Sequence, residues 1–203
     1  MSMFKNENYT DDDREELLTI IENSFGEHST ILHEIVFDYL HIDVVVIPPT
    51  KELNFYKLFT IGMGSKKMNT SPQLERAELA VFISPKYDFS INDIKKHWIV
   101  NFLKTVARFP FNQNTWLGEG HTVDLSKVGN FGNFSGALLL SLQSEEEAIV
   151  LDSNKSINFY LTVPIFYEEM KYKNMKSYDE LLDLFDSNGI TPVVNFNRIN
   201  CCK

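Results

Sequence analysis

The apolar positions near the N-terminus recur at the spacing of a helix. Leu17, Ile21 and Phe25 are four residues apart, which places them on one face of an α-helix. Thr10 precedes three aspartates. A hydroxyl at this place can cap the first helical turn, and aspartates stabilise its positive end. Because Gly26 is a typical stop, the pattern predicts a helix that begins after Thr10 and ends at Gly26.

Short apolar runs after this helix predict strands, because they are bounded by turn residues and too short for helices. The run from His41 to Ile47 is apolar nearly throughout and indicates a central strand. Pro48 and Pro49 end it, since proline donates no hydrogen bond to a ladder. Predicted strands lie at residues 31–39, 41–47, 55–62, 78–84, 136–142, 148–151 and 157–166.

Three further segments have helical signals. Ser90 and Asp93 form a capping-box pattern ahead of a long amphipathic helix. Two short helices close the chain, the second capped by Ser177 and stopped at Gly189. Strands and helices mix without strict βαβ alternation, which predicts an α+β fold with a mixed, largely antiparallel sheet flanked by helices. No repeat or linker interrupts the chain, so we expect one domain over residues 1–203, with flexible ends at 1–10 and 200–203.

The composition indicates a well-packed core and a protein partner rather than nucleic acid. The chain is 43% hydrophobic and has 16 Phe and 8 Tyr, enough for a core that needs no metal or cross-link. Its net charge of −9, from 28 acidic and 19 basic side chains, argues against nucleic acid as a partner. The same charge favours a basic protein partner, although solubility alone also explains it.

The sequence also predicts a cytoplasmic location. Its apolar runs are strand-sized, so we expect no membrane span, and the polar N-terminus has no apolar core of a secretory signal. The two cysteines, Cys201 and Cys202, are adjacent, and adjacent cysteines rarely form a disulfide. We expect two reduced thiols.

Histidines give little sign of a metal site. His33 is followed by Glu34, but position 37 is Phe, so the zinc-binding HExxH pattern is absent. His41 is expected to bond a neighbour such as Asp43 rather than a metal. The sequence therefore predicts neither a metal nor another cofactor.

Two glycine-containing segments could carry chemistry. Gly62-Met63-Gly64-Ser65 faintly resembles a phosphate-binding loop, but the P-loop and dinucleotide patterns are incomplete, so a turn is favoured. In the second segment, Glu119 and His121 could share a proton as an acid–base pair. The alternative is a glycine-shaped turn whose polar groups satisfy one another, with Trp116 in the core. No nucleophile or oxyanion hole can be named, and we favour the turn.

Several blocks of sequence, in order, resemble the suppressor-of-fused-like family. They are residues 41–50 (HIDVVVIPPT), 55–63 (FYKLFTIGM), 78–83 (ELAVFI), 98–111 followed by 114–122 (NTWLGEGHT), and 161–189. Together they cover the chain from about residue 21 to its end. One departure is clear. Many relatives read Gly-Met-Ser-Asp where this chain has Gly62-Met63-Gly64-Ser65, so an acidic group is lost at this turn.

The resemblance implies a domain like the N-terminal half of the animal suppressor of fused, which sequesters a transcription factor by trapping a short peptide. The chain is too short to hold that protein's second half and looks like the stand-alone bacterial form. Members of that form are regarded as immunity proteins or antitoxins encoded beside secreted toxins. We therefore expect a non-enzymatic domain that binds a toxin encoded by a neighbouring gene. The oligomeric state is left open.

Three functional hypotheses follow. The first is toxin neutralisation, the second is an adaptor that captures a peptide of an endogenous protein, and the third is a hydrolase-like enzyme that uses Glu119 and His121. A binding surface needs a few aromatic or polar anchors inside a polar rim. Candidate partner-binding residues are Tyr56, Met63, Ser65, Trp116, Glu119, His121 and Tyr167.

Overall fold

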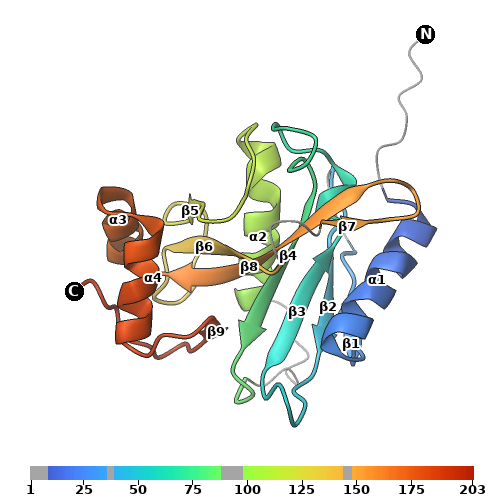
Figure 1. Cartoon of the computed structure of the whole chain (residues 1–203). Helices are drawn as coiled ribbons and strands as arrows, with labels where there is room; N and C mark the ends of the chain where they lie inside the picture. Colours follow the sequence, from blue (N-terminus) through green and yellow to red (C-terminus); the bar gives the residue numbers. More distant parts are fainter. Residues whose placement is uncertain (1–8, 36–38, 88–97, 144–147) are drawn as a thin grey trace.

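The computed structural model describes residues 9–35, 39–87, 98–143 and 148–203 (Figure 1). The helices are α1 (Asp11–Phe25), α2 (Trp98–Asn112), α3 (Tyr167–Met175) and α4 (Tyr178–Ser187), with a short 3₁₀ turn, η1 (Met63–Ser65). The strands are β1 (Thr30–Leu32), β2 (Asp43–Ile47), β3 (Tyr56–Ile61), β4 (Ala77–Ile83), β5 (Thr122–Asp124), β6 (Gly136–Ser141), β7 (Ile149–Val150), β8 (Ser156–Ile165) and β9 (Val193–Val194). None of the described helices is long and apolar enough to cross a bilayer.

The strands form one mixed sheet in the order β1-β2-β3-β4-β8-β6-β5. Neighbours along this order are antiparallel except β4 and β8, which run parallel with Ala77 opposite Asn158. β7 extends the sheet beside the start of β8, and β9 lies parallel to the end of β4. The predicted α+β class with a mixed, largely antiparallel sheet is confirmed.

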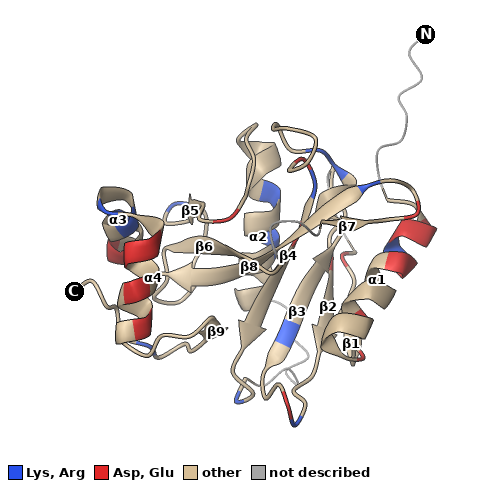
Figure 2. Cartoon of the chain, in the orientation of Figure 1, with Lys and Arg blue, Asp and Glu red and all other residues tan. Residues whose placement is uncertain are grey.

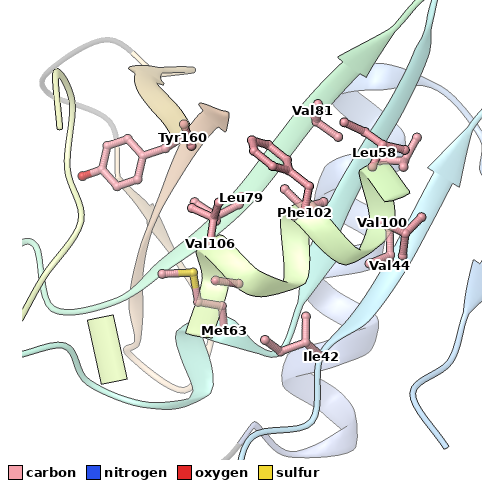
Figure 3. Packing of buried hydrophobic residues seen from close by; sticks show 14 of the residues in the cluster. Ile42, Val44, Leu58, Met63, Leu79, Val81, Val100, Phe102, Val106 and Tyr160 are labelled. Atoms are coloured by element: carbon pink, nitrogen blue, oxygen red, sulfur yellow. The ribbon is translucent and has the colours of Figure 1, made fainter. Parts of the chain in front are cut away.

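Helices cover both faces of the sheet, so alternate side chains of the central strands enter two separate cores (Figure 1). In β2, Val44 faces the cluster that contains α2, whereas Val45 faces the cluster that contains α1. This two-sided burial explains why the β2 sequence reads as a continuous apolar run. Figure 3 shows the α2-side cluster, in which Val100 and Val106 of α2 pack over the sheet.

The predicted start of α1 is confirmed in detail. The Thr10 hydroxyl accepts a hydrogen bond from Asp13 N, and the Asp13 carboxylate accepts one from Thr10 N, which is a capping box. Asp13 also accepts bonds from Lys155 Nζ (2.8 Å) and Ser153 Oγ (2.5 Å) in the loop between β7 and β8. Burial acts to raise the pKa of Asp13, but these bonds outweigh it and lower the pKa from 3.8 to about 2.

The first predicted strand was too long. β1 ends at Leu32, because the side chains of Glu34 and Asp43 replace ladder partners: Asp43 Oδ1 accepts from Glu34 N, and Glu34 Oε2 accepts from Ile42 N. The expected bond from His41 to Asp43 is present at 2.9 Å. Residues 36–38 lie outside the described part of the chain.

The other predicted elements agree with the structure to within one or two residues where they are described. α4 begins at a Ser177 cap and ends before Gly189. The predicted Ser90–Asp93 capping box falls outside the described residues, and α2 is described from Trp98 onward. Sequence patterns missed β5, β9 and η1, each only two or three residues long.

The C-terminal residues, for which we expected a flexible tail, make specific contacts. Asn200 Nδ2 donates to Glu168 (2.8 Å), and Cys201 N donates to Glu169 (3.3 Å). Both cysteines pack against the α1-side core as free thiols. Burial and the neighbouring Glu169 raise the pKa of Cys201 to about 12, which keeps the thiol protonated.

Candidate functional site

A groove of about 490 Å³ opens where the start of β8 pairs with the start of β4. We call it the Trp116 groove. Its walls come from the segment before β4, the turn of residues 116–121 that follows α2, the strands β6 and β8, and residues 143 and 148 between those strands. The residues that line it include Gln73, Trp116, Glu119, Gln143, Asn158 and Tyr160.

The 116–121 turn forms one rigid wall. The indole of Trp116 lies across Gly118, where a Cβ atom would be 2.5 Å from the ring, so any larger residue would displace the indole. The other side of the turn is bonded to β6: Gly120 N donates to Leu139 O (2.8 Å), and Leu139 N donates to His121 O (3.0 Å). The turn therefore continues the sheet and holds the indole in place.

Glu119 stands at the rim of the groove, next to two tyrosines. The ring of Tyr178, on α4, packs over Gly120, and its hydroxyl donates to Glu119 Oε1 at 3.3 Å. Burial and the charge of Glu119 raise the pKa of Tyr178 to about 12 and also raise the pKa of Tyr160. In Figure 3 the hydroxyl of Tyr160 points away from the α2-side cluster, in keeping with its position in the groove wall.

Two amide side chains line the opposite wall and are oriented by backbone contacts. Asn158 Nδ2 donates to the carbonyls of Gln73 (2.9 Å) and Arg76 (3.1 Å), so both N–H groups of its side-chain amide are engaged. Gln143 Oε1 accepts from Phe159 N at 2.9 Å, between the parts of β8 that pair with β7 and β6. The groove is thus built from side chains with defined orientations.

His121 supports the wall rather than forming an acid–base pair. Its ring packs edge-on against Trp116 with centroids 4.2 Å apart. Burial is the main cause that lowers the pKa of His121, with a further lowering by Lys173, so the imidazole is neutral at pH 7. Among the described residues, no hydrogen bond or ion pair joins His121 to Glu119. The geometry gives the hydrolase hypothesis no support.

Met63 and Ser65 lie at the same end of the sheet but are buried, with 0% and 3% exposure, so neither side chain reaches the surface. Their turn is held by Glu78, which accepts hydrogen bonds from Gly62 N (2.9 Å), Gly64 N (3.0 Å) and Met63 N (3.3 Å). These are the N–H groups that a phosphate would need, so the turn is filled by the protein's own carboxylate.

The Glu78 cluster is completed by two further side chains. Thr60 Oγ1 donates to Glu78 Oε2 (2.5 Å), and the buried Arg76 donates to the carbonyls of Gly64 and Ser65, both at 2.7 Å. Complete burial raises the pKa of Glu78 in spite of the bonds that it accepts. The cluster fixes the end of β3 beside the Trp116 groove.

Tyr56 and Tyr167 lie away from the groove. Tyr56 is opposite Ile83, at the far end of β4, a strand of seven residues that spans about 20 Å. Tyr167 begins α3 beyond the far end of β8 and is 46% exposed, with Lys171 over its ring. The structure therefore brings together Trp116, Glu119 and His121 but separates them from both tyrosines.

Sequence reasoning missed much of the groove. Asn158 and Tyr160 reach the 116–121 turn through the pairing of β8 with β6, and Gln73 reaches them through the parallel pairing of β4 with β8, which no local pattern reveals. Glu78 had a usable signal, because a charged residue in an otherwise apolar strand needs buried partners. Among the described residues, no cluster of three or more His, Cys, Asp or Glu could hold a metal ion.

The model of the suppressor of fused protein (SUFU) family matches residues 38–199. The chain belongs to the SUFU family. No curated protein matches its sequence. The match covers every block on which the sequence resemblance rests, from the strand at residues 41–47 to α4.

Solved structures share the SUFU fold with this chain. A SUFU homologue from Neisseria gonorrhoeae FA 1090 is 18% identical, with a TM-score of 0.66, and the alignment covers 93% of this chain and 96% of the homologue. A Sufu–Fu complex is 12% identical, with a TM-score of 0.65 over 93% of this chain and 91% of the other. Drosophila Suppressor of Fused is 14% identical, with a TM-score of 0.65 over 92% of this chain and 50% of the Drosophila chain.

Proposed function

We propose that this SUFU-family chain is a non-enzymatic protein-binding domain that acts as an immunity protein. In this proposal it neutralises a toxin encoded by a neighbouring gene, and it does so in the cytoplasm by direct binding. The observation that carries the proposal is the Trp116 groove, a preformed recess with an aromatic wall and oriented polar groups beside a carboxylate. Such recesses suit the anchor residues of a protein partner.

Charge supports the same proposal. Figure 2 shows acidic residues on α1 and on the helices α3 and α4, and the net charge is −9. A negative surface accelerates association with a basic protein and slows it with nucleic acid. The free, protonated Cys201 suits a reducing compartment.

An adaptor that captures an endogenous protein is a second candidate. It is favoured by the Sufu–Fu complex among the structures that share this fold. A pull-down from the source cells separates the two candidates, because the immunity proposal expects a toxin from the neighbouring gene and the adaptor proposal expects an ordinary cellular protein.

Co-expression tests the immunity proposal. The product of the neighbouring reading frame is expressed with the wild-type chain, with Leu74→Trp, or with Glu52→Gln. Leu74 is a half-buried lining residue, so the added indole fills the groove, whereas Glu52 is exposed on the loop between β2 and β3. We expect growth with the wild type and Glu52→Gln and loss of rescue with Leu74→Trp. A neighbouring product that is not toxic, or one that is toxic but not neutralised, overturns the proposal.

A further inference from the structure

Among the described residues that line the Trp116 groove, Glu119 is the one charged side chain, and it is an acid. Glu119 receives a hydrogen bond from Tyr178, but among the described residues it has no ion-pair partner within 4 Å. A carboxylate at the rim of a recess, bonded only to a neutral hydroxyl, keeps its capacity to pair with an incoming cation.

Three basic side chains near the groove are already engaged elsewhere, whereas Lys173 of α3, which lowers the pKa of His121, has no ion pair within 4 Å in the part of the chain that the structure describes. Arg76 donates to the carbonyls of Gly64 and Ser65, Lys67 pairs with Glu75, and Lys155 pairs with Asp13. These contacts direct three nearby positive charges away from Glu119. No cation in the described ranges pairs with Glu119, so its carboxylate can pair with a cation of the partner.

The walls next to Glu119 are aromatic. Trp116 is held across Gly118 and against His121, and Tyr160 lines the groove from β8. A cation over an indole or phenol face is attracted by the ring, and the planar guanidinium of arginine also stacks on it. An ammonium group lacks that plane and the two parallel donors that match a carboxylate.

The amide of Asn158 presents an acceptor to the groove. Asn158 uses its amide N–H groups on two backbone carbonyls, which leaves its carbonyl oxygen to accept a bond. The Asn158 carbonyl oxygen and the Glu119 carboxylate therefore match a ligand that carries several donors, whereas Gln143, whose Oε1 accepts from Phe159 N, offers N–H groups instead. Arginine has five N–H donors and no acceptor.

We propose that the Trp116 groove receives an arginine side chain of the protein partner, with the guanidinium paired to Glu119 and stacked on Trp116. This inference rests on the proposed function and names the chemistry of its partner. A volume of about 490 Å³ leaves room for the arginine and the adjacent backbone of the partner.

A peptide titration tests the inference without the toxin. The probes are acetyl-Gly-Arg-Gly-amide and the same peptide with citrulline, which keeps the shape of arginine but has no charge. Amide shifts of Trp116 and Gly118 are followed by NMR in the wild type, Glu119→Gln and the control Glu52→Gln. Glu119 is exposed, so its substitution should leave the fold intact, as circular dichroism can verify.

We expect saturable shifts with the arginine peptide in the wild type and in Glu52→Gln, and affinity weaker by about tenfold or more in Glu119→Gln and with citrulline. Equal binding of the citrulline peptide, or an unchanged affinity in Glu119→Gln, overturns the inference. Failure here leaves the growth-rescue result standing, and failure of growth rescue leaves the arginine site standing, so the two claims are separable.

Discussion

The imidazole of His121 packs against the indole of Trp116 with ring centroids 4.2 Å apart. Between the two residues the turn carries glycines at 118 and 120, which admit the Trp116 and Tyr178 rings. The contact joins a side chain that faces the groove to the strand that follows, β5, and through it to the sheet. Each binding proposal above depends on this wall keeping its shape.

His121→Ala is expected to lower the free energy of unfolding by about 1–2 kcal/mol at pH 7, because it removes the ring contact and leaves a gap. The loss should shrink at lower pH. Burial lowers the pKa of His121, so the unfolded chain takes up a proton before the folded one, and wild-type stability falls as the pH drops below about 6.5. Urea unfolding at pH 7 and pH 5 measures both values. A wild-type-to-variant difference that is the same at both pH values contradicts this reading.

Glu78→Gln is expected to cost about 2 kcal/mol of stability. The amide places a donor among backbone N–H groups that now share a carboxylate, so at least one buried donor loses its partner. Glu52→Gln makes the same chemical change on an exposed loop and should stay within about 0.5 kcal/mol of the wild type. Denaturant unfolding compares the three proteins, and equal midpoints for all of them would show that the Glu78 cluster adds nothing.

Asp13→Asn should destabilise the protein at neutral pH by about 2 kcal/mol, the value of a shift in pKa from 3.8 to about 2. Because the pKa of Asp13 is lower in the folded chain than in the unfolded chain, the carboxylate stabilises the fold at pH values above about 3.8. This contribution is lost as the pH falls from 4 to 2. The difference between wild type and variant should therefore narrow over that range. Unfolding free energies at pH 7, 4 and 3 test it, and a constant difference argues against the Lys155 and Ser153 contacts as its source.

Gly64→Ala is expected to destabilise the chain, because the added methyl group would lie 2.1 Å from the Tyr9 hydroxyl. Tyr9→Phe removes that oxygen. In the Tyr9→Phe background the cost of Gly64→Ala should fall by about 1 kcal/mol or more, a coupling that a double-mutant cycle measures. Strictly additive costs would mean that the clash lies elsewhere, for instance with the Ala77 carbonyl at 3.2 Å.

Local sequence signals predicted the parts of the fold that depend on neighbours in sequence. Thr10 and Asp13 predicted the start of α1, and the apolar run after His41 predicted a central strand. The first strand was predicted too long because Glu34 and Asp43 bond backbone groups across a loop. These side-chain bonds replace strand-to-strand bonds, and the spacing of apolar residues does not reveal them.

The sequence predicted one wall of the candidate site and missed the other. Trp116, Glu119 and His121 drew attention because glycines shape their turn. The facing wall could not be predicted, since Asn158 and Tyr160 lie about 40 residues later in the chain and reach that turn only through the pairing of β8 with β6. Met63 also looked like a surface anchor, but its burial depends on Glu78 holding the end of β3.

We propose that this chain acts by stoichiometric binding rather than by turnover. The most direct measurement titrates the purified chain into a fixed amount of the neighbouring gene's product and follows the residual toxic activity. We expect a linear loss of activity that ends at one equivalent of the chain, with a complex that co-elutes on gel filtration. Complete loss at a small fraction of an equivalent, with no complex, would mean catalysis and would contradict it.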